Sequence, residues 1–113
     1  MPFVNVKANF QIEDGKVLAI KENLGKLIEI LPGKSEKWLM VQIEDNQKIF
    51  FSGSDDKAVL VQVDLFGESD DESLNSFTSN ISSYLQNELS VAKKRIYVRY
   101  LSTNYWGYNG ENF

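Results

Sequence analysis

Histidine and cysteine are both absent from this chain of 113 residues, so any proton transfer must rely on other groups. Their absence removes the most common general base, the thiolate nucleophile and zinc–thiolate sites. The remaining candidates are carboxylates, lysines, tyrosines and the amino terminus of the chain.

The sharpest candidate is Pro2, which follows the initiator Met1. Methionine is usually removed before a small residue such as proline, and its removal would leave a secondary amine at the terminus. Burial and a nearby cation both disfavour the charged form of an amine. An amine held near neutrality is an effective proton shuttle. Met-Pro is also a common start of a chain, so these two residues alone do not identify a site.

Two other patterns have an ordinary structural interpretation. The acidic residues Glu68, Asp70, Asp71 and Glu72 suggest a cation site, but acidic side chains are expected in the first turn of a helix because of the helix dipole. The sequon Asn80-Ile81-Ser82 falls inside an expected helix, and we treat it as chance.

Composition and charge limit the class of protein. The net charge is −4, from 12 basic and 16 acidic residues, without a long basic block, which argues against nucleic acid or an anionic membrane as the main partner. Neither a secretory signal nor an apolar run of membrane-spanning length is visible. We expect one domain over residues 1–113 in the cytoplasm, with release by an unconventional route left open.

Hydrophobic spacing gives two similar halves, each with the order strand, helix, strand. The expected strands are 3–8, 38–44, 58–66 and 95–101, with a short extra strand at 49–51, and the expected helices are 13–31 and 69–89. Ser69 and Glu72 predict a capping box at the start of the second helix. Each half is a βαβ unit, which favours parallel pairing within the half and an α/β layer.

The two faces of the expected strands differ. One face is aliphatic and should lie under the two helices: Val4, Val6, Leu39, Val41, Ile43, Val59, Val61, Val63, Leu65, Ile96 and Val98. The other face mixes large apolar groups such as Trp38, Met40 and Tyr97 with polar ones such as Gln62 and Arg99. A mixed surface of this kind often meets another subunit, so we expect an oligomer.

Five features occur along the chain in a characteristic order. They are Pro2 at the start of a strand, Gly33-Lys34 after the first helix, Phe51-Ser52-Gly53-Ser54 before the third strand, Arg95-Ile96-Tyr97-Val98 in the fourth, and the ending 106–113, WGYNGENF. In these features the chain resembles the macrophage migration inhibitory factor family of the tautomerase superfamily, over essentially its full length.

The resemblance implies two βαβ units forming a four-stranded mixed sheet with two helices on one face. It also implies a homotrimer with a pocket at each subunit interface, and keto–enol tautomerisation of phenylpyruvate-like 2-oxo acids without a metal or another cofactor. By the same resemblance, Pro2 is the catalytic base, Lys34 binds the substrate carboxylate, and Phe66 lines the pocket at a position where the family usually has Ile. Tyr97 is expected from the neighbouring subunit. Without the resemblance, Lys34 is an ordinary lysine near a helix C-terminus.

The aromatic tail is expected to wall the pocket through Trp106, Tyr108 and Phe113, with Tyr108 at a position usually held by Trp. These side chains and Tyr97 could equally serve the core or a subunit contact. Ala58 and Val61 stand where the mammalian cytokine has a Cys-x-x-Cys pair, so the thiol chemistry ascribed to that pair is excluded.

Arg99 stands where the family usually has Asn, on the same strand face as Tyr97. One hypothesis is that Arg99 adds a second cation to the pocket, which would favour more acidic substrates and lower the pKa of Pro2. The other is that Arg99 pairs with a carboxylate such as Asp64 and never meets substrate.

Two alternative functions remain open on the sequence. The chain could be a cytokine-like trimer that binds a protein receptor or other partner, with weak or vestigial activity. It could also use the same amine for a related superfamily reaction on a small oxo acid, such as decarboxylation or hydration.

Overall fold

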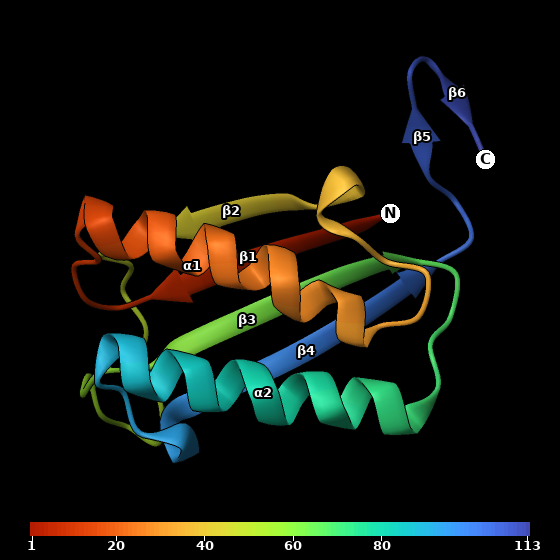
Figure 1. Cartoon of the computed structure of the whole chain (residues 1–113). Coiled ribbons are helices and arrows are strands. Elements are labelled where there is room, and N and C mark those ends of the chain that lie inside the picture. The colour runs from red at the N-terminus through yellow and green to blue at the C-terminus, as the bar shows by residue number, and fades with distance from the viewer.

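The computed structural model describes all 113 residues. Two helices, α1 (Asp14–Leu27) and α2 (Asp71–Leu89), lie across one face of a four-stranded sheet (Figure 1). The sheet strands are β1 (Pro2–Ala8), β2 (Met40–Glu44), β3 (Val59–Phe66) and β4 (Ile96–Thr103). The C-terminal tail leaves the sheet as a small hairpin made of β5 (Gly107–Tyr108) and β6 (Glu111–Asn112).

The sheet is mixed, with the spatial order β2-β1-β3-β4. Strand β1 pairs with β2 in parallel and β3 pairs with β4 in parallel, while β1 and β3 are antiparallel at the centre. Each parallel pair is joined through one of the helices, as a parallel connection requires. The expected pair of βαβ units on a four-stranded mixed sheet is therefore confirmed.

The aliphatic face of the strands packs under the helices, as predicted. On β3 the alternation is complete, with Val59, Val61, Val63 and Leu65 buried. One polar group joins this face from β4: the Tyr100 hydroxyl donates to the Leu74 carbonyl at 3.0 Å and lies 2.7 Å from the Thr78 hydroxyl. Burial raises the pKa of Tyr100, so the ring remains a neutral hydrogen-bonding group between the sheet and α2.

The first helix is shorter than predicted. Residues 13–31 were expected to be one α-helix, but α1 ends at Leu27 and a single 3₁₀ turn, η1 (Ile28–Ile30), continues it. Tightening of the last turn is common where α-helical carbonyls run out of partners. Ile28 and Leu31 remain buried, so their predicted place in the core is unchanged.

The second helix begins one residue later than the predicted capping box. Asp70, not Ser69, is the N-cap: its Oδ2 accepts from the Ser73 backbone N–H at 3.0 Å and its Oδ1 from the Ser73 hydroxyl at 2.7 Å. These bonds lower the pKa of Asp70. A carboxylate is a stronger acceptor than a serine hydroxyl at a positive helix terminus, which explains why the cap moved.

The connection between β2 and β3 does not contain the predicted extra strand. Residues 49–51 were predicted to be a short strand, but only a single bridge joins Phe51 to Ser54. Ser52 and Gly53 both have positive φ, 55° and 75°, so the chain turns back at once and cannot extend the pairing. Trp38 likewise lies in a 3₁₀ turn, η2 (Glu36–Trp38), and β2 starts only at Met40.

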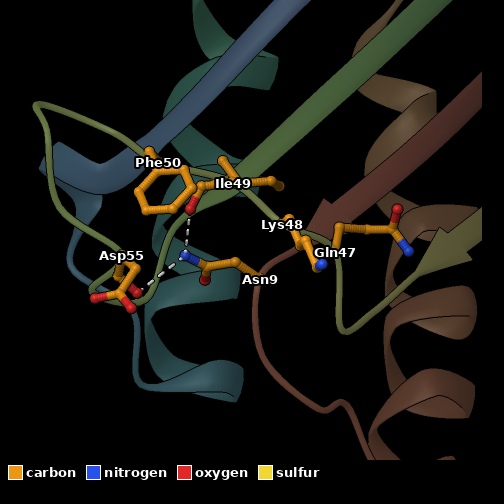
Figure 2. A pocket seen from close by; sticks show the side chains of 6 residues that line it. All are labelled: Asn9, Gln47, Lys48, Ile49, Phe50 and Asp55. Atoms are coloured by element: carbon orange, nitrogen blue, oxygen red, sulfur yellow. Dashed lines mark hydrogen bonds between the residues drawn. The ribbon is translucent and has the colours of Figure 1, made fainter.

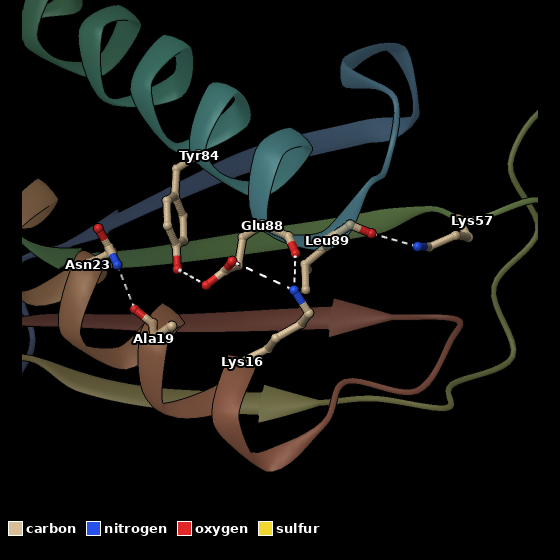
Figure 3. A network of polar contacts seen from close by, with 7 residues as sticks. All are labelled: Lys16, Ala19, Asn23, Lys57, Tyr84, Glu88 and Leu89. Atoms are coloured by element: carbon tan, nitrogen blue, oxygen red, sulfur yellow. Dashed lines mark hydrogen bonds and ion pairs between the residues drawn. The ribbon is translucent and has the colours of Figure 1, made fainter.

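Two lysines fasten the far end of α2 (Figure 3). Lys16 donates from Nζ to the Glu88 carbonyl at 2.8 Å, and Lys57 donates from Nζ to the Leu89 carbonyl. Cations at a helix C-terminus satisfy free carbonyls and complement the dipole. Burial, followed by the charge of Glu88, raises the pKa of the neighbouring Tyr84 to about 12.

Candidate active site

The amino terminus lies at the rim of a hollow of about 280 Å³. Its lining is mainly apolar, and Lys37 is the one charged residue in it. The full lining is Met1, Pro2, Phe3, Lys37, Trp38, Leu39, Met40, Trp106, Gly107 and Tyr108. A mostly apolar pocket with a single cation suits a small anionic molecule that carries an aromatic group.

Pro2 does not lie in a loose terminal segment, because it belongs to a central strand of the sheet. It begins β1, lies opposite Leu65 of β3 and is buried. The preceding carbonyl, of Met1, accepts from the Phe66 backbone N–H at 3.1 Å. The sheet thus fixes the position of the residue whose nitrogen becomes the terminal amine once Met1 is removed.

Lys34 stands beside this terminus. Its Nζ donates to the Phe66 carbonyl at 3.0 Å, and its backbone N–H donates to the Leu31 carbonyl at 3.1 Å. Gly33, with φ at 79°, makes the turn that brings Lys34 out of the helical segment. Burial, and then the positive charge of Lys34, lower the pKa of the Met1 amine. Both causes of a more neutral terminal amine are therefore present at this position.

Aromatic side chains from two distant segments close the hollow. The ring of Tyr108 meets Trp38 edge-on, with centroids 5.2 Å apart, and stacks on Phe113 at 6.3 Å. Phe113 in turn lies 5.5 Å from Phe66. The structure thus brings Phe66, Trp106, Tyr108 and Phe113 to the same end of the sheet as Pro2. Trp106 and Tyr108 line the hollow, whereas Phe66 and Phe113 lie outside its lining.

The tail reaches this place through a tight hairpin. Asn109 and Gly110 both have positive φ, 54° and 85°, which matches the Asn-Gly turn favoured in two-residue hairpins. The Phe113 backbone N–H closes the hairpin onto the Trp106 carbonyl at 2.9 Å. This local turn, rather than packing against the core, shapes the tail.

Trp38, Lys37 and Met40 line the hollow but were not predicted to belong to the site. The sequence offered one signal: Trp38 and Met40 both fall on the mixed face of the strands, where apolar side chains lack a place in the core. Because Trp38 sits in a 3₁₀ turn before β2, its approach to Tyr108 depends on the position of the tail.

Tyr97 and Arg99 are not brought to this hollow within one chain. Leu65, opposite Pro2, pairs with Ser102 of β4, and Tyr97 precedes Ser102 by five positions, or about 17 Å at the usual strand rise. Tyr97 is 62% exposed on the open face of the sheet. It packs instead on Phe51, with ring centroids 4.7 Å apart. Its contribution to a neighbouring pocket stays a prediction.

Arg99 has no ionic partner within the chain. The two ion pairs are Lys7 with Glu44 at 4.0 Å and Lys16 with Glu88 at 3.7 Å, so a pair between Arg99 and Asp64 is not formed in one protomer. The Oδ1 atom of Asp64 is buried on the same open face without a hydrogen-bond partner.

A second hollow, of about 190 Å³, lies at the opposite end of the sheet (Figure 2). It is lined by Asn9, Gln47, Lys48, Ile49, Phe50 and Asp55. Its central polar side chain is Asn9, whose amide already donates to the backbone carbonyls of Ile49 and Asp55 and accepts from the Ala58 backbone N–H. We assign this hollow no ligand.

No three carboxylates gather closely enough to form a candidate metal site. Of the acidic residues considered above as a cation site, Asp70 is the N-cap of α2, Asp71 and Glu72 lie in its first turn, and Glu68 precedes the cap. Neither helix combines the length and the apolarity that crossing a membrane requires.

The whole chain, residues 1–113, matches a family model described as macrophage migration inhibitory factor (MIF). A macrophage migration inhibitory factor homolog of Trichuris trichiura is 30% identical over 115 residues, which cover 100% of both chains. The crystal structure of Leishmania major MIF2 is similar with a TM-score of 0.93 and 31% identity, covering 100% of this chain and 97% of that one. The factor from Trichinella spiralis, at 20% identity, shares the fold with a TM-score of 0.84, covering 98% of this chain and 99% of that one.

Proposed function

Because this chain belongs to the macrophage migration inhibitory factor family, we propose that it is a cofactor-independent keto–enol tautomerase acting on phenylpyruvate-like 2-oxo acids. Pro2, exposed by removal of Met1, is the proposed base. The observation that carries this proposal is the position of Lys34 beside the amino terminus: Lys34 donates to the carbonyl of Phe66, the residue whose backbone N–H donates to the Met1 carbonyl. Met1 and Pro2 in turn line the aromatic hollow.

The surroundings of the terminus favour a neutral amine. Burial and the Lys34 charge lower the pKa of the Met1 amine, and removal of Met1 moves the free amine inward to Pro2, which is buried between β2 and β3. Both effects disfavour a charged nitrogen, and we expect them to act on the Pro2 amine as well. A secondary amine is more basic than a primary one. The same surroundings should therefore bring the pKa of the Pro2 amine towards neutral pH, and not far below it.

The reaction moves one proton between carbon and oxygen. In the keto-to-enol direction, the neutral Pro2 nitrogen removes a proton from the carbon next to the carbonyl, and the prolinium then delivers that proton to the enolate oxygen, which leaves the amine neutral again. In the reverse direction Pro2 takes the proton of the enol hydroxyl and delivers it to the carbon. Lys34 holds the substrate carboxylate, and Trp38, Tyr108 and Phe113 provide flat apolar surfaces for the ring.

The site needs a second chain to be complete. Within one protomer no side-chain donor from β4 reaches the hollow, since Tyr97 lies about 17 Å along the sheet. In a homotrimer with interface pockets, Tyr97 of the adjacent subunit supplies the hydroxyl that stabilises the developing enolate. The exposed, mixed face of the sheet supports an oligomer of this kind.

Arg99 adjusts the substrate preference. It is exposed and without an ion pair in the chain, and it leaves the sheet on the same face as Tyr97. If Tyr97 enters a neighbouring pocket, Arg99 brings a second cation towards it, which favours dicarboxylic oxo acids over phenylpyruvate. An Arg99→Asn variant should lose that preference. Unchanged kinetics towards mono- and dicarboxylates would assign Arg99 to a subunit contact instead.

The proposed activity is tested with phenylpyruvate and hydroxyphenylpyruvate, using protein whose N-terminus has been identified by mass spectrometry. The parent should be active, and Pro2→Gly should reduce kcat by at least about a hundredfold, the contribution of a general base. A second preparation that retains Met1 serves as a control and should be equally inactive. Activity that survives in either protein would refute the role of Pro2. A processed, trimeric parent without activity would favour a cytokine-like, partner-binding trimer, whose receptor would then be sought.

A further inference from the structure

We propose that Phe51 is a positioning residue for this reaction: it holds the Tyr97 ring in the orientation that a neighbouring subunit's pocket requires. This inference rests on the proposed function, since it concerns how Tyr97 is presented. Phe51 and Tyr97 are the one aromatic pair on the open face of the sheet at the end remote from Pro2, with centroids 4.7 Å apart and planes inclined by 57°.

Arg95 fixes the loop that carries Phe51. The Nε atom of Arg95 donates to the Lys57 carbonyl at 3.0 Å, and Nη1 donates to the Phe51 carbonyl at 2.9 Å. Nη2 donates to the carbonyls of Ser54 at 3.1 Å and Asp56 at 2.9 Å. One rigid guanidinium thus gathers four carbonyls of a seven-residue stretch, which no flexible ammonium could match.

Asn9 fastens the same loop from the other side (Figure 2). Its Nδ2 atom donates to the carbonyls of Ile49, Asp55 and Asp56 at 3.0, 3.2 and 3.0 Å, and its Oδ1 accepts from the Ala58 backbone N–H at 2.8 Å. Strand β1 and the entry to β4 therefore clamp the loop between them. Such complete use of side-chain donors leaves the backbone around Phe51 little freedom to move.

We call Arg95 and Asn9, with the loop carbonyls that they bind, the clamp. Arg95 precedes Tyr97 by two residues. Arg95 ends the 3₁₀ turn η3 (Lys93–Arg95) just before β4, and its guanidinium lies 5.2 Å over the Phe51 ring. The same Phe51 ring contacts Tyr97. Arg95 and Tyr97 therefore both touch Phe51, and a displacement of the loop that carries Phe51 alters the contact with the tyrosine.

Tyr97 needs such support because it has no other. It is 62% exposed and its hydroxyl forms no hydrogen bond within the chain, in contrast to Tyr100 on the opposite face. An exposed aromatic side chain otherwise samples several rotamers. Fixing one rotamer before the neighbouring pocket is filled improves alignment of the donor, and misplacement by about 1 Å can cost a hundredfold in rate.

The test is a double-mutant cycle on the processed trimer, with Phe51→Leu, Tyr97→Ala and the double variant. Leucine keeps the apolar bulk but removes the flat ring. In the presence of Tyr97, Phe51→Leu should lower kcat/KM by about tenfold, whereas in the Tyr97→Ala background the same change should alter it less than about twofold. The phenylpyruvate dissociation constant, followed by the fluorescence of Trp38 and Trp106, gives the same cycle without turnover.

Phe10→Leu is the matched control. Phe10 lies at the same end of the molecule, packs against the core and carries a lysine cation over its ring, with Lys57 Nζ at 4.3 Å, but it makes no aromatic pair with Tyr97. Its replacement should reduce the melting temperature and leave kcat/KM unchanged. Phe51→Tyr retains the ring and should preserve activity. If Phe51→Leu fails to fold, Arg95→Lys takes its place in the cycle.

Each outcome decides one question. Coupling between positions 51 and 97, with the trimer intact by sedimentation, supports the positioning role. Equal effects of Phe51→Leu with and without Tyr97 would overturn it, and the tautomerase itself would stand on the Pro2→Gly result. A processed, trimeric parent that neither turns over nor binds phenylpyruvate would overturn both.

Discussion

The two ends of the sheet are stabilised in different ways. At the end where β1 finishes and β4 begins, Asn9, Arg95 and Lys57 direct their side-chain donors to backbone carbonyls. At the end where β1 begins, one lysine, Lys34, donates to a backbone carbonyl, and the other contacts are mainly between rings; Tyr108 and Phe113 are 51% and 59% exposed. The first arrangement fixes a loop in one conformation, and the second leaves apolar surface available for a ligand or a neighbouring chain.

This contrast matches two requirements of the proposed interface site. A side chain that must act on another subunit needs rigid support in its own chain, and the contact between Phe51 and Tyr97 would provide it. A pocket that admits substrate needs walls that can separate slightly, and stacked rings on a short hairpin permit that. The two ends can be perturbed separately, and the expected effects differ in kind.

The largest expected effect is at the clamp. Arg95→Ala leaves four carbonyls of residues 51–57 without their donors, and we expect a loss of about 3 kcal/mol in the free energy of unfolding. Urea denaturation measures this, with Lys94→Ala, an exposed neighbour, as the control. A loss below about 0.5 kcal/mol would show that the clamp adds no more than an ordinary surface group.

Next in size is Lys34→Ala at the open end. Loss of the carboxylate partner should lower kcat/KM by about a hundredfold. Because the Lys34 charge lowers the pKa of the terminal amine, its removal should raise the pKa of the base. The neutral amine then forms only at higher pH, so the low-pH limb of the kcat/KM profile should shift to higher pH. Lys37→Ala tests the one lysine that lines the hollow. A profile that does not move would separate Lys34 from the amine.

A chain ending at Trp106 tests the tail. It lacks the hairpin and the rings of Tyr108 and Phe113, all outside the core. We expect the free energy of unfolding to change by less than about 1 kcal/mol, while KM for phenylpyruvate rises about tenfold through loss of the ring surface. A large loss of stability instead would mean that the tail is part of the subunit contact.

The smallest effect concerns the cap of α2, which follows the end of β3 but does not line the hollow. Asp70→Ala removes the acceptor of two bonds from Ser73 and should lower the melting temperature slightly at neutral pH. The cap lowers the pKa of Asp70, so its stabilisation is present above the ordinary aspartate pKa and is lost as pH falls through the lowered value. The parent and the variant should therefore converge in acid. A difference that persists there would have another cause.

Much of the end of the sheet where β1 begins could be predicted, because its parts are short segments with characteristic residues. Pro2, the Gly33-Lys34 turn and the Asn109-Gly110 hairpin are short-range features, and the resemblance supplied their expected roles. Trp38 was missed since its partner Tyr108 lies seventy positions away. The role of Arg95 was missed for a related reason. In the sequence Arg95 is one of three consecutive basic residues, Lys93-Lys94-Arg95, and its four acceptors are backbone carbonyls that only the folded loop brings within reach.

The sequence by itself determined the order of elements, the aliphatic face that meets the helices and the absence of histidine and cysteine chemistry, because alternation and composition are properties of the chain alone. Local competition changed the details, such as the Asp70 cap and the 3₁₀ turn after α1. Only the tertiary structure decided that Lys34 lies beside the amino terminus and that Phe51 lies against Tyr97. Electrostatic and aromatic contacts depend on distances between atoms, and the distance between residues far apart in sequence is set by how the sheet brings its strands together.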